Sequence, residues 1–343
     1  MNPAATRRLG KTGLKLTTLG LGGSQLGNLH RPCPEPDALA AIAAAYDLGV
    51  RYFDTAAYYG GGLGEHRMGR GLRAHPRARY VLSTKIGRLL SPEPNSGLKP
   101  YVDRLPFSVR FDYGYDAALR SLDDSLMRLG LDRVDIALIH DPDAATHGPG
   151  WKPLFDEAMT GTYRALKRLR DEGVVRAIGI GSVDWRVCEL GAQRGDFDCF
   201  LLAGRYSLLE QPALASMLPL CVKRKIGVVV GQVFNTGILA RGLRRRSTYG
   251  HRPPPPAVRA KIEALERVAR AHRVPLAAAA LQFPLAHPAV ASIVVGGRSA
   301  AHLSGYARGL ATPIPADFWA ELKHDGLLDP AAPVPPRGLR ADV

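Results

Sequence analysis

The sequence predicts an α/β fold, a (β/α)8 TIM barrel preceded by an N-terminal β-hairpin and carrying extra helices. Eight short apolar segments recur along the chain, and longer segments with helical periodicity separate them. This alternation is typical of a parallel sheet whose strands are covered by helices. The length of 343 residues suits one large barrel, and no linker or repeat divides it. We therefore expect a single domain over residues 1–343.

The eight apolar segments are each short enough to be one buried strand. They are "TTLGLGG" from Thr17, "RYFDT" from Arg51, "YVLSTKIG" from Tyr80, "VDIALIHD" from Val134, "VRAIGIGS" from Val175, "FDCFLLA" from Phe197, "IGVVVGQ" from Ile226 and "VASIVVGG" from Val290.

The clearest helices are "EPDALAAIAAAYDLG", "YDAALRSLDDSLMRLG" and "TYRALKRLRDEG", each closed by a glycine at the expected end. The opening segment "RRLGKTGLKLTTLG" predicts the hairpin, with Lys-Thr-Gly at its turn. An extra helix is expected within "PPPPAVRAKIEALERVARAH", before the last strand. Residues 88–112 are long for a barrel loop, and they follow the third strand, so they should overhang the face that carries the active site.

The composition excludes several function classes. The formal charge is +15 and the pI about 9.9, but the charge is spread along the chain and only "RGLRRR" is dense. No nucleic-acid-binding motif accompanies it, so small anions such as phosphates are the better partners. The four cysteines form no CxxC pair and no HExxH occurs, which argues against a disulfide scaffold and a metal site. The start of the chain lacks an apolar core, and prolines interrupt the long apolar stretch at residues 274–297, so we expect a cytoplasmic protein without a membrane span.

Four polar residues gather at the predicted strand ends. Asp54, Lys85 and His140 end the second, third and fourth strands, and Tyr59 lies five residues beyond Asp54 in "DTAAYYGGGLGE". Catalytic groups of a barrel sit at the carboxyl ends of strands. A free phenol is a poor acid or base at neutral pH. An ammonium beside it would lower its pKa, and Asp54 would keep that ammonium charged.

Each of these residues alone has an ordinary structural explanation, such as a solvated lysine, a core histidine or a helix cap. Their joint placement favours chemistry, namely proton transfer at a carbonyl oxygen while a hydride moves at carbon. Tyr58 is an alternative to its neighbour Tyr59 at this point.

"FDTAAYYG", "VLSTKIG" and "DIALIHD" resemble the aldo-keto reductase family, over nearly the whole chain. The resemblance implies a catalytic tetrad of Asp54, Tyr59, Lys85 and His140, since the family's tyrosine follows its aspartate by five residues. "LLAGRYSLLEQ" and "FNTGILA" are further similar to the subgroup of L-fucose dehydrogenase, or D-threo-aldose 1-dehydrogenase, with pyridoxal 4-dehydrogenase nearby. These enzymes oxidise a cyclic hemiacetal to a lactone.

The resemblance also implies a nicotinamide cofactor, NADP or NAD, bound at the barrel top, in keeping with the absence of a GxGxxG motif. Tyr206 would stack on the nicotinamide ring, the loop 234–239 would pass the pyrophosphate, and Arg298 would pair with a 2′-phosphate at a helix start. The expected cofactor-binding residues are Gly22, Gly23, Ser182, Tyr206, Phe234, Asn235, Thr236, Gly237, Leu239, Gly296, Gly297, Arg298 and Ser299.

Two departures from the family pattern concern the cofactor. Ser182 is followed by no asparagine to hold the carboxamide, and a Glu-Asn pair near the adenine is replaced around Gly305 and Tyr306. These departures leave open the choice between NAD and NADP. The sequence also does not determine the oligomeric state or the physiological direction of the reaction.

The expected function is oxidation of the C1 hydroxyl of an aldose such as L-fucose, L-galactose or D-arabinose. Polar residues of the long loop would meet its hydroxyls: Asn95, Ser96, Lys99, Asp103 and Arg104. Pyridoxal is the rival substrate, with Phe107, Tyr113 and Trp151 available to stack on its ring. A general aldehyde or ketone reductase and a non-catalytic, cofactor-sensing regulatory module are the remaining alternatives.

Overall fold

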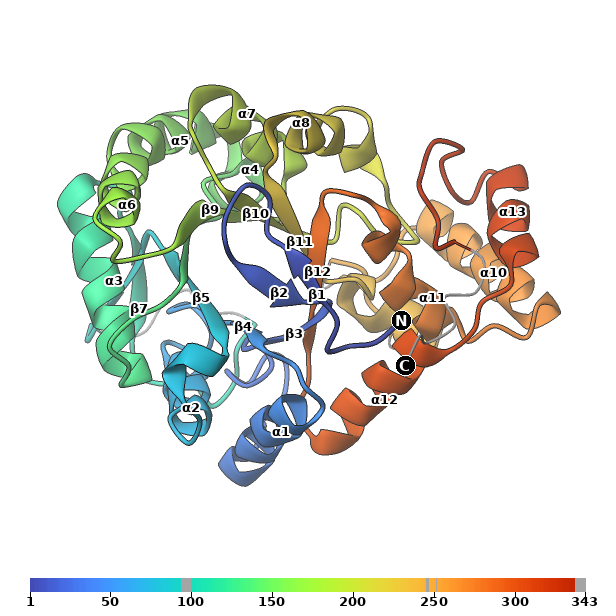
Figure 1. The fold of residues 1–343 in the computed structure, drawn as a ribbon, viewed down its shortest axis with the longest axis horizontal. Helices are drawn as coiled ribbons and strands as arrows, with labels where there is room; N and C mark the ends of the chain where they lie inside the picture. Colours follow the sequence, from blue (N-terminus) through green and yellow to red (C-terminus); the bar gives the residue numbers. More distant parts are fainter. Residues whose placement is uncertain (94–99, 245–246, 251, 337–343) are drawn as a thin grey trace.

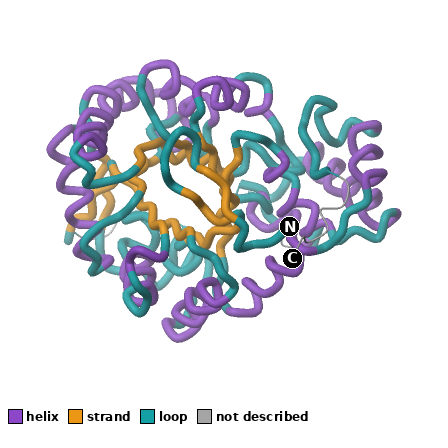
Figure 2. Tube along the Cα trace, in the orientation of Figure 1, coloured by secondary structure: helices purple, strands orange, loops and turns teal. Residues whose placement is uncertain are grey.

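Eight parallel strands close into a barrel in the computed structural model, which describes residues 1–93, 100–244, 247–250 and 252–336. The strands follow chain order around the barrel: β3 (Leu19–Gly22), β4 (Tyr52–Asp54), β5 (Val81–Ile86), β8 (Ile136–His140), β9 (Ala177–Ser182), β10 (Cys199–Ala203), β11 (Gly227–Gly231) and β12 (Val290–Gly296), which pairs again with β3. All eight predicted strands are confirmed, and the predicted barrel with them. Figure 2 shows the strands as an inner ring within the helices.

Helices cover the outside of the barrel (Figure 1). They are α1 (Glu35–Asp47), α2 (Leu63–Leu72), α3 (Tyr115–Leu129), α4 (Ala144–His147), α5 (Trp151–Thr160), α6 (Thr162–Asp171), α7 (Trp185–Arg194), α8 (Met217–Arg224), α9 (Ile238–Arg241), α10 (Pro256–Ala271), α11 (Leu276–Gln282), α12 (Ala300–Ala311) and α13 (Ala316–His324). Short 3-10 turns are η1 (Arg77–Arg79), η2 (Gly148–Gly150), η3 (Pro212–Leu214), η4 (Asn235–Gly237) and η5 (Pro284–Ala286).

The helix ends follow the glycine signals of the sequence. Gly49, Gly130 and Gly173, which follow α1, α3 and α6, have φ of 82°, 61° and 76°. These left-handed conformations end a helix at little cost only when the residue lacks a Cβ. The extra helix expected before the last strand is α10, and it packs beside α13 at one side of the barrel (Figure 1).

An N-terminal hairpin closes the bottom of the barrel. Strands β1 (Thr6–Arg8) and β2 (Lys15–Thr17) pair antiparallel, as predicted. Leu9, Leu14 and Leu16 join the apolar cluster inside the barrel, and the Lys11 amide donates to Lys225 O at 2.8 Å, just before β11. Because this end is plugged by side chains, the open end is the one where the strands finish.

The segment expected to be a long loop contains a second hairpin. Strands β6 (Arg88–Ser91) and β7 (Ser108–Phe111) pair antiparallel directly after β5, and β6 contacts α3. Three polar residues proposed to meet a sugar, Asn95, Ser96 and Lys99, lie outside the described residues.

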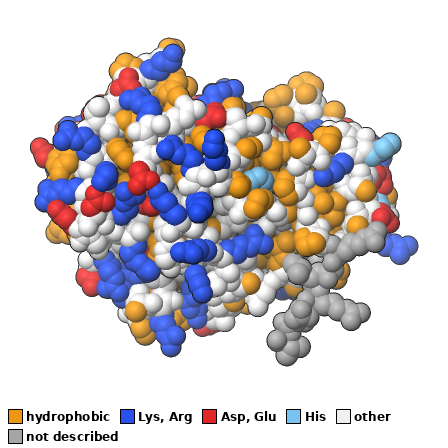
Figure 3. Space-filling model, turned by 45° about the horizontal axis from the view of Figure 1, so that its top comes forward, with side chains coloured by type: hydrophobic (Ala, Val, Ile, Leu, Met, Phe, Trp, Pro, Cys, Tyr) orange, Lys and Arg blue, Asp and Glu red, His pale blue; other side chains and the backbone are white. Residues whose placement is uncertain are grey.

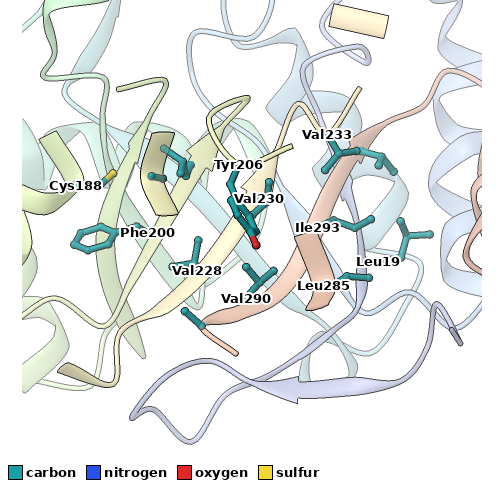
Figure 4. Packing of buried hydrophobic residues seen from close by; sticks show 14 of the residues in the cluster. Leu19, Cys188, Phe200, Tyr206, Val228, Val230, Val233, Leu285, Val290 and Ile293 are labelled. Carbon is teal, nitrogen blue, oxygen red and sulfur yellow. The ribbon is translucent and has the colours of Figure 1, made fainter. Parts of the chain in front are cut away.

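The core has two layers. One lies inside the barrel and is lined by inward-facing strand residues such as Leu138 and Val229. The larger layer lies between the strands and the helices and includes Phe200, Val228 and Val230 (Figure 4). Whether a side chain faces the inner or the outer layer therefore decides whether it can reach the top of the barrel.

The positively charged side chains are dispersed over the surface. Lys and Arg side chains are spread over the face in Figure 3, with Asp and Glu among them. In the part of the chain that the structure describes, no helix is long and apolar enough to cross a membrane.

Candidate active site

A buried ion pair stands at the top of neighbouring strands. Lys85 Nζ donates to Asp54 Oδ2 at 2.6 Å and to the carbonyl of Thr55 at 2.9 Å. The two side chains are only 2% and 3% exposed. Ser83 donates to the other Asp54 oxygen at 2.7 Å. The carboxylate thus supplies the counter-charge that a buried ammonium needs.

Tyr59 is carried to this pair by a tightly packed loop between β4 and α2. Gly60 has φ of 69°, and a Cβ on it would lie 2.4 Å from Gly27 O. A Cβ on Gly27 would in turn lie 2.6 Å from the carbonyl carbon of Tyr59. Only glycine permits this approach of two backbones. The glycines of "YYGGGLG" therefore fix where the tyrosine side chain begins.

The Lys85 ammonium lies over the Tyr59 ring, 4.8 Å from its centroid. The sequence predicts a lowered phenol pKa here, and that prediction is wrong for the free protein. The pKa of Tyr59 is raised well above its ordinary value, first by desolvation and then by the charges of Asp54 and Asp141. The reason is that burial disfavours the charged phenolate, and two nearby carboxylates disfavour it further.

His140 ends β8 and completes the group. Its ring centroid lies 6.1 Å from that of Tyr59, with the planes at 88°. Burial, followed by the charges of Arg88 and Lys85, lowers the pKa of His140 well below its ordinary value. The imidazole is therefore neutral near pH 7, and it can donate one hydrogen bond to an oxygen between it and Tyr59.

Tyr58 and Tyr59 differ in the cation that they meet. Both rings lie about the same distance from the His140 ring, 6.2 Å for Tyr58 and 6.1 Å for Tyr59. The Lys85 ammonium lies over the Tyr59 ring, whereas the Arg88 guanidinium lies over the Tyr58 ring, 4.2 Å from its centroid. The geometry associates Tyr59, and not Tyr58, with the Asp54–Lys85 pair.

The structure thus brings Asp54, Tyr59, Lys85 and His140 to one place at the barrel top. The arrangement combines a phenol that can give or take a proton, a buried ammonium and a neutral imidazole donor. Such a set can polarise a carbonyl oxygen and exchange a proton with it.

Three loops expected to bind the cofactor also converge. Gly22 pairs with Gly296 across β3 and β12, and a Cβ on Gly296 would lie 2.8 Å from the Gln25 side chain. The Phe234 and Tyr306 rings lie 5.6 Å apart, which joins the loop after β11 to α12. The Tyr306 hydroxyl donates to Gly296 O at 2.8 Å.

The second of these loops forms a tight backbone turn. Asn235, Thr236 and Gly237 have φ of 44°, 57° and 95°, and the amides of Asn235 and Gly237 donate to Gln232 O at 2.8 Å and to Phe234 O at 2.9 Å. The Thr236 hydroxyl donates to Thr248 O at 2.6 Å, which ties the loop to the segment that follows α9. Leu239 is fully buried beneath it.

Arg298 lies at the start of α12 in a positive field. Its pKa is lowered by burial first and then by the charge of Arg31. Its guanidinium donates to Leu29 O, while its Nε finds no partner among the described residues. Ser299 precedes the helix without a side-chain capping bond and instead contacts His302 Nδ1 at 2.8 Å. An incompletely satisfied arginine at an open helix N-terminus fits a phosphate, so these residues are suited to a nicotinamide dinucleotide.

Ser182 is engaged by protein groups. Its hydroxyl donates to Asp143 Oδ2 and accepts from the Asp184 amide at 2.9 Å. Asp143 also caps α4 by accepting from the Thr146 amide at 2.9 Å. The hydroxyl proposed to face a carboxamide therefore already joins two loops of the top face. Gly23, by contrast, lies beside the tetrad, with its amide donating to Asp54 O at 2.7 Å.

The Tyr206 side chain turns away from the barrel opening. Its ring is fully buried in the outer core layer, between Phe283 at 5.1 Å and His287 at 5.5 Å (Figure 4). Phe283 and His287 flank η5, which precedes β12 and lies toward the plugged end. The structure does not bring Tyr206 to the tetrad, so the expected stacking on a nicotinamide ring does not agree with this placement.

Three residues at the site were missed as functional candidates. Arg88 and Asp141 form a buried ion pair beside His140, and Tyr101 is buried with its ring 6.1 Å from that of Tyr59. Asp141 directly follows a predicted catalytic residue, and Arg88 lies three residues after another. Their positions in sequence were therefore a usable signal, whereas nothing local distinguished Tyr101.

The chain is similar to known proteins over nearly its whole length. The chain is 40% identical over 337 residues to pyridoxal 4-dehydrogenase of Microbacterium luteolum, covering 94% of this chain and 97% of that protein. It is 40% identical over 323 residues to D-threo-aldose 1-dehydrogenase of a Pseudomonas species, covering 92% and 96%. An aldo-keto reductase from Bacillus halodurans in its holo form shares the fold, with a TM-score of 0.74 at 24% identity over 94% of this chain and 96% of that one. Residues 18–324 match the model of the aldo/keto reductase family, and the chain belongs to that family.

Proposed function

We propose that this oxidoreductase oxidises the C1 hydroxyl of a cyclic aldose to the lactone, with NADP or NAD as the hydride acceptor. The observation that carries the proposal is the assembly of Tyr59, Lys85, Asp54 and His140 at the ends of adjacent strands. The substrate class rests on the similarity to a relative named D-threo-aldose 1-dehydrogenase. L-Fucose, L-galactose and D-arabinose are the expected substrates.

In the proposed reaction the C1 hydrogen leaves as a hydride and the hydroxyl proton leaves through Tyr59. His140 donates a hydrogen bond to the reacting oxygen and holds it beside the phenol. Asp54 pairs with the Lys85 ammonium, and the charge of that ammonium favours the phenolate that accepts the proton. The product keeps the ring oxygen and gains a C1 carbonyl, so two electrons and two hydrogens have left the sugar.

The bound nicotinamide would take up the hydride at carbon. Arg298 and the start of α12 would bind a phosphate, and the loop 234–239 would pass the pyrophosphate, as the family resemblance implies. Because Arg298 can read a 2′-phosphate, we propose that NADP is accepted as well as NAD.

The raised pKa of Tyr59 bears on direction. A phenol that stays protonated near neutral pH is prepared to donate a proton to a carbonyl, which is the step needed for reduction. Oxidation needs the phenolate, so it should accelerate toward alkaline pH.

Pyridoxal is the second candidate substrate, because the relative that acts on it is equally similar at 40% identity. Two of the rings proposed to stack on pyridoxal have other contacts. Tyr113 is fully buried and donates to His140 O at 2.8 Å, and Trp151 packs on Phe155 at 6.1 Å. Tyr58, whose ring lies near that of His140, and Tyr101, whose ring lies near that of Tyr58, are the stacking partners that remain for pyridoxal.

A panel assay tests the proposal. Initial rates with NAD⁺ and NADP⁺ are measured for L-fucose, L-galactose, D-arabinose and pyridoxal, and the product is identified as lactone by mass spectrometry. We expect kcat/KM to be highest for one of the sugars. A tenfold preference for pyridoxal would replace the aldose assignment, and no turnover with any of them would favour a general carbonyl reductase or a cofactor-sensing module.

We also propose a cytoplasmic location. All four cysteines are buried free thiols in the structure, as expected in a reducing compartment.

A further inference from the structure

Arg88 and Asp141 form an ion pair against the tetrad that the mechanism above does not use. The Arg88 guanidinium donates to Asp141 Oδ2, and the same oxygen lies 3.3 Å from His140 Nε2. Arg88 begins β6, two residues after the end of β5, and Asp141 directly follows His140 at the end of β8. The pair therefore joins the β6–β7 hairpin to the strand that carries the imidazole.

Stability is a poor explanation for this pair. A buried ion pair loses most of its Coulombic gain to desolvation, and apolar residues of similar size often serve as well. Arg88 Nε is also buried and has no hydrogen-bond partner among the described residues. An arrangement that costs free energy in two ways is more simply explained by function than by folding.

Asp141 is held in a backbone conformation that aspartate rarely adopts. Its φ is 47°, and two contacts fix it there: its amide donates to Gly181 O at 2.9 Å, and the Tyr113 hydroxyl lies 3.2 Å from its carbonyl. Strain of this kind is retained where the surroundings impose a side-chain direction. Here it aims the carboxylate at the space beside His140.

The carboxylate is the accessible member of the group. The Asp141 side chain is 18% exposed, against 5% for Arg88 and 6% for His140. Its Oδ1 makes no hydrogen bond to any other residue that the structure describes. A ligand at the tetrad would thus meet a hydrogen-bond acceptor, the Asp141 carboxylate, beside a hydrogen-bond donor, the Arg88 guanidinium.

We propose that Asp141 and Arg88 bind the hydroxyl on the carbon next to the reacting carbon, and so select substrates that carry one. The oxygens of two neighbouring carbons lie about a hydrogen-bond length apart. When His140 Nε2 holds the first oxygen, the second therefore falls within reach of Asp141, which is adjacent to Nε2. The hydroxyl donates to the carboxylate and accepts from the guanidinium. This selection rests on the proposed function, since it concerns substrates of that same site.

The test compares two sugars that differ by one hydroxyl. D-Arabinose carries a C2 hydroxyl, and 2-deoxy-D-ribose is the same pentose without it. A site that hydrogen-bonds a hydroxyl rejects the analogue lacking it strongly, because its own polar groups are then left unpaired. We expect wild-type kcat/KM to favour D-arabinose by about 100-fold or more. Asp141→Asn and Arg88→Met should each reduce that ratio at least tenfold, mainly by loss on D-arabinose.

The matched control is the other buried carboxylate–arginine pair nearby. Glu65 accepts from Arg128 at 2.6 Å and from Thr84 at 2.7 Å, and Thr84 faces away from the site because its neighbour Lys85 faces toward it. Glu65→Gln should change stability but leave the sugar ratio unchanged. Circular dichroism and thermal melts establish that each variant is folded, and Arg88→Lys serves if Arg88→Met is not.

The outcomes separate this inference from the proposed function. An unchanged ratio in Asp141→Asn, with both sugars slowed equally, would mean that Asp141 only positions His140, and the inference would be wrong while the aldose activity stood. If the wild type oxidises pyridoxal and no aldose, the inference is wrong together with the aldose assignment, because the carbon next to the reacting carbon of pyridoxal carries no hydroxyl.

Discussion

The ammonium of Lys85 lies over the face of the Tyr59 ring, 4.8 Å from its centroid, while it donates to Asp54 at 2.6 Å. The charge of Lys85 is thus paired with Asp54 on one side, and its other side faces the phenol of Tyr59. Because the effect of the ammonium on Tyr59 depends on its pairing with Asp54, substitution of any one of these residues should change the behaviour of the other two.

Tyr59→Phe should reduce kcat by roughly 10²–10⁴-fold, since it removes only the hydroxyl proposed to carry the proton. Cofactor affinity, measured by quenching of protein fluorescence, should stay near that of the wild type. Tyr58→Phe is the matched control and should retain much more activity, because its ring meets Arg88 and not Lys85. The assignment is wrong if the two variants behave in the reverse order.

Asp54→Asn should destabilise the protein by about 3–5 kcal/mol, because it leaves a buried ammonium without its counter-charge. Urea denaturation at pH 7 measures this change. The double variant Asp54→Asn with Lys85→Met should recover part of the loss, since no charge is then left unpaired. Additive losses in the double variant would show that the two residues do not act as a pair.

The pH dependence of sugar oxidation should contain an acid limb near pH 6. Burial raises the pKa of the Asp141 carboxyl to about 6, and Arg88 opposes that rise. Above this pH the ionised carboxylate accepts the sugar hydroxyl, and below it protonation removes the acceptor, so kcat/KM should fall as pH falls through 6. His140 would not produce this limb, because its pKa is lowered well below its ordinary value. Profiles of wild type and Asp141→Asn at constant ionic strength decide the point: a limb that persists in the variant belongs to another group.

Arg298→Ala should raise KM for NADP⁺ more than KM for NAD⁺, by about tenfold or more in the ratio, because only NADP⁺ carries the 2′-phosphate. Arg308→Ala, on an exposed face of the same helix, is the control for a general loss of positive charge. Equal effects of Arg298→Ala on both cofactors would show that Arg298 does not read the 2′-phosphate.

Tyr206→Phe should leave cofactor KM unchanged, because the ring lies in the outer core layer. The buried hydroxyl has no partner among the described residues, so its removal should be neutral or slightly stabilising. Tyr206→Ala should cost about 3–5 kcal/mol of stability, as large aromatic truncations in cores do. A marked rise in cofactor KM for the phenylalanine variant would contradict the placement of Tyr206.

The sequence by itself determined the barrel and the location of its chemistry. Short apolar runs and glycine-ended helices are local signals, and eight of them in alternation leave few topologies. Asp54, Lys85 and His140 end three consecutive strands, and parallel strands bring their carboxyl ends to one face. These three residues could therefore be predicted together without coordinates, and the family resemblance added Tyr59 in preference to Tyr58.

The tertiary structure decided which way side chains face beyond the strand ends and which distant groups meet. Tyr206 lies a few residues after β10, and nothing local says that its ring turns outward against Phe283 and His287. The lowered phenol pKa expected from Lys85 depends on the distance of Asp54 and on burial, which are both properties of the packed core. Arg88 and Asp141 are 53 residues apart, and the pairing of β5 with β8, with Ile86 opposite Ile139, places them side by side just beyond the strand ends. Contacts of this range are fixed by packing, which no local pattern records.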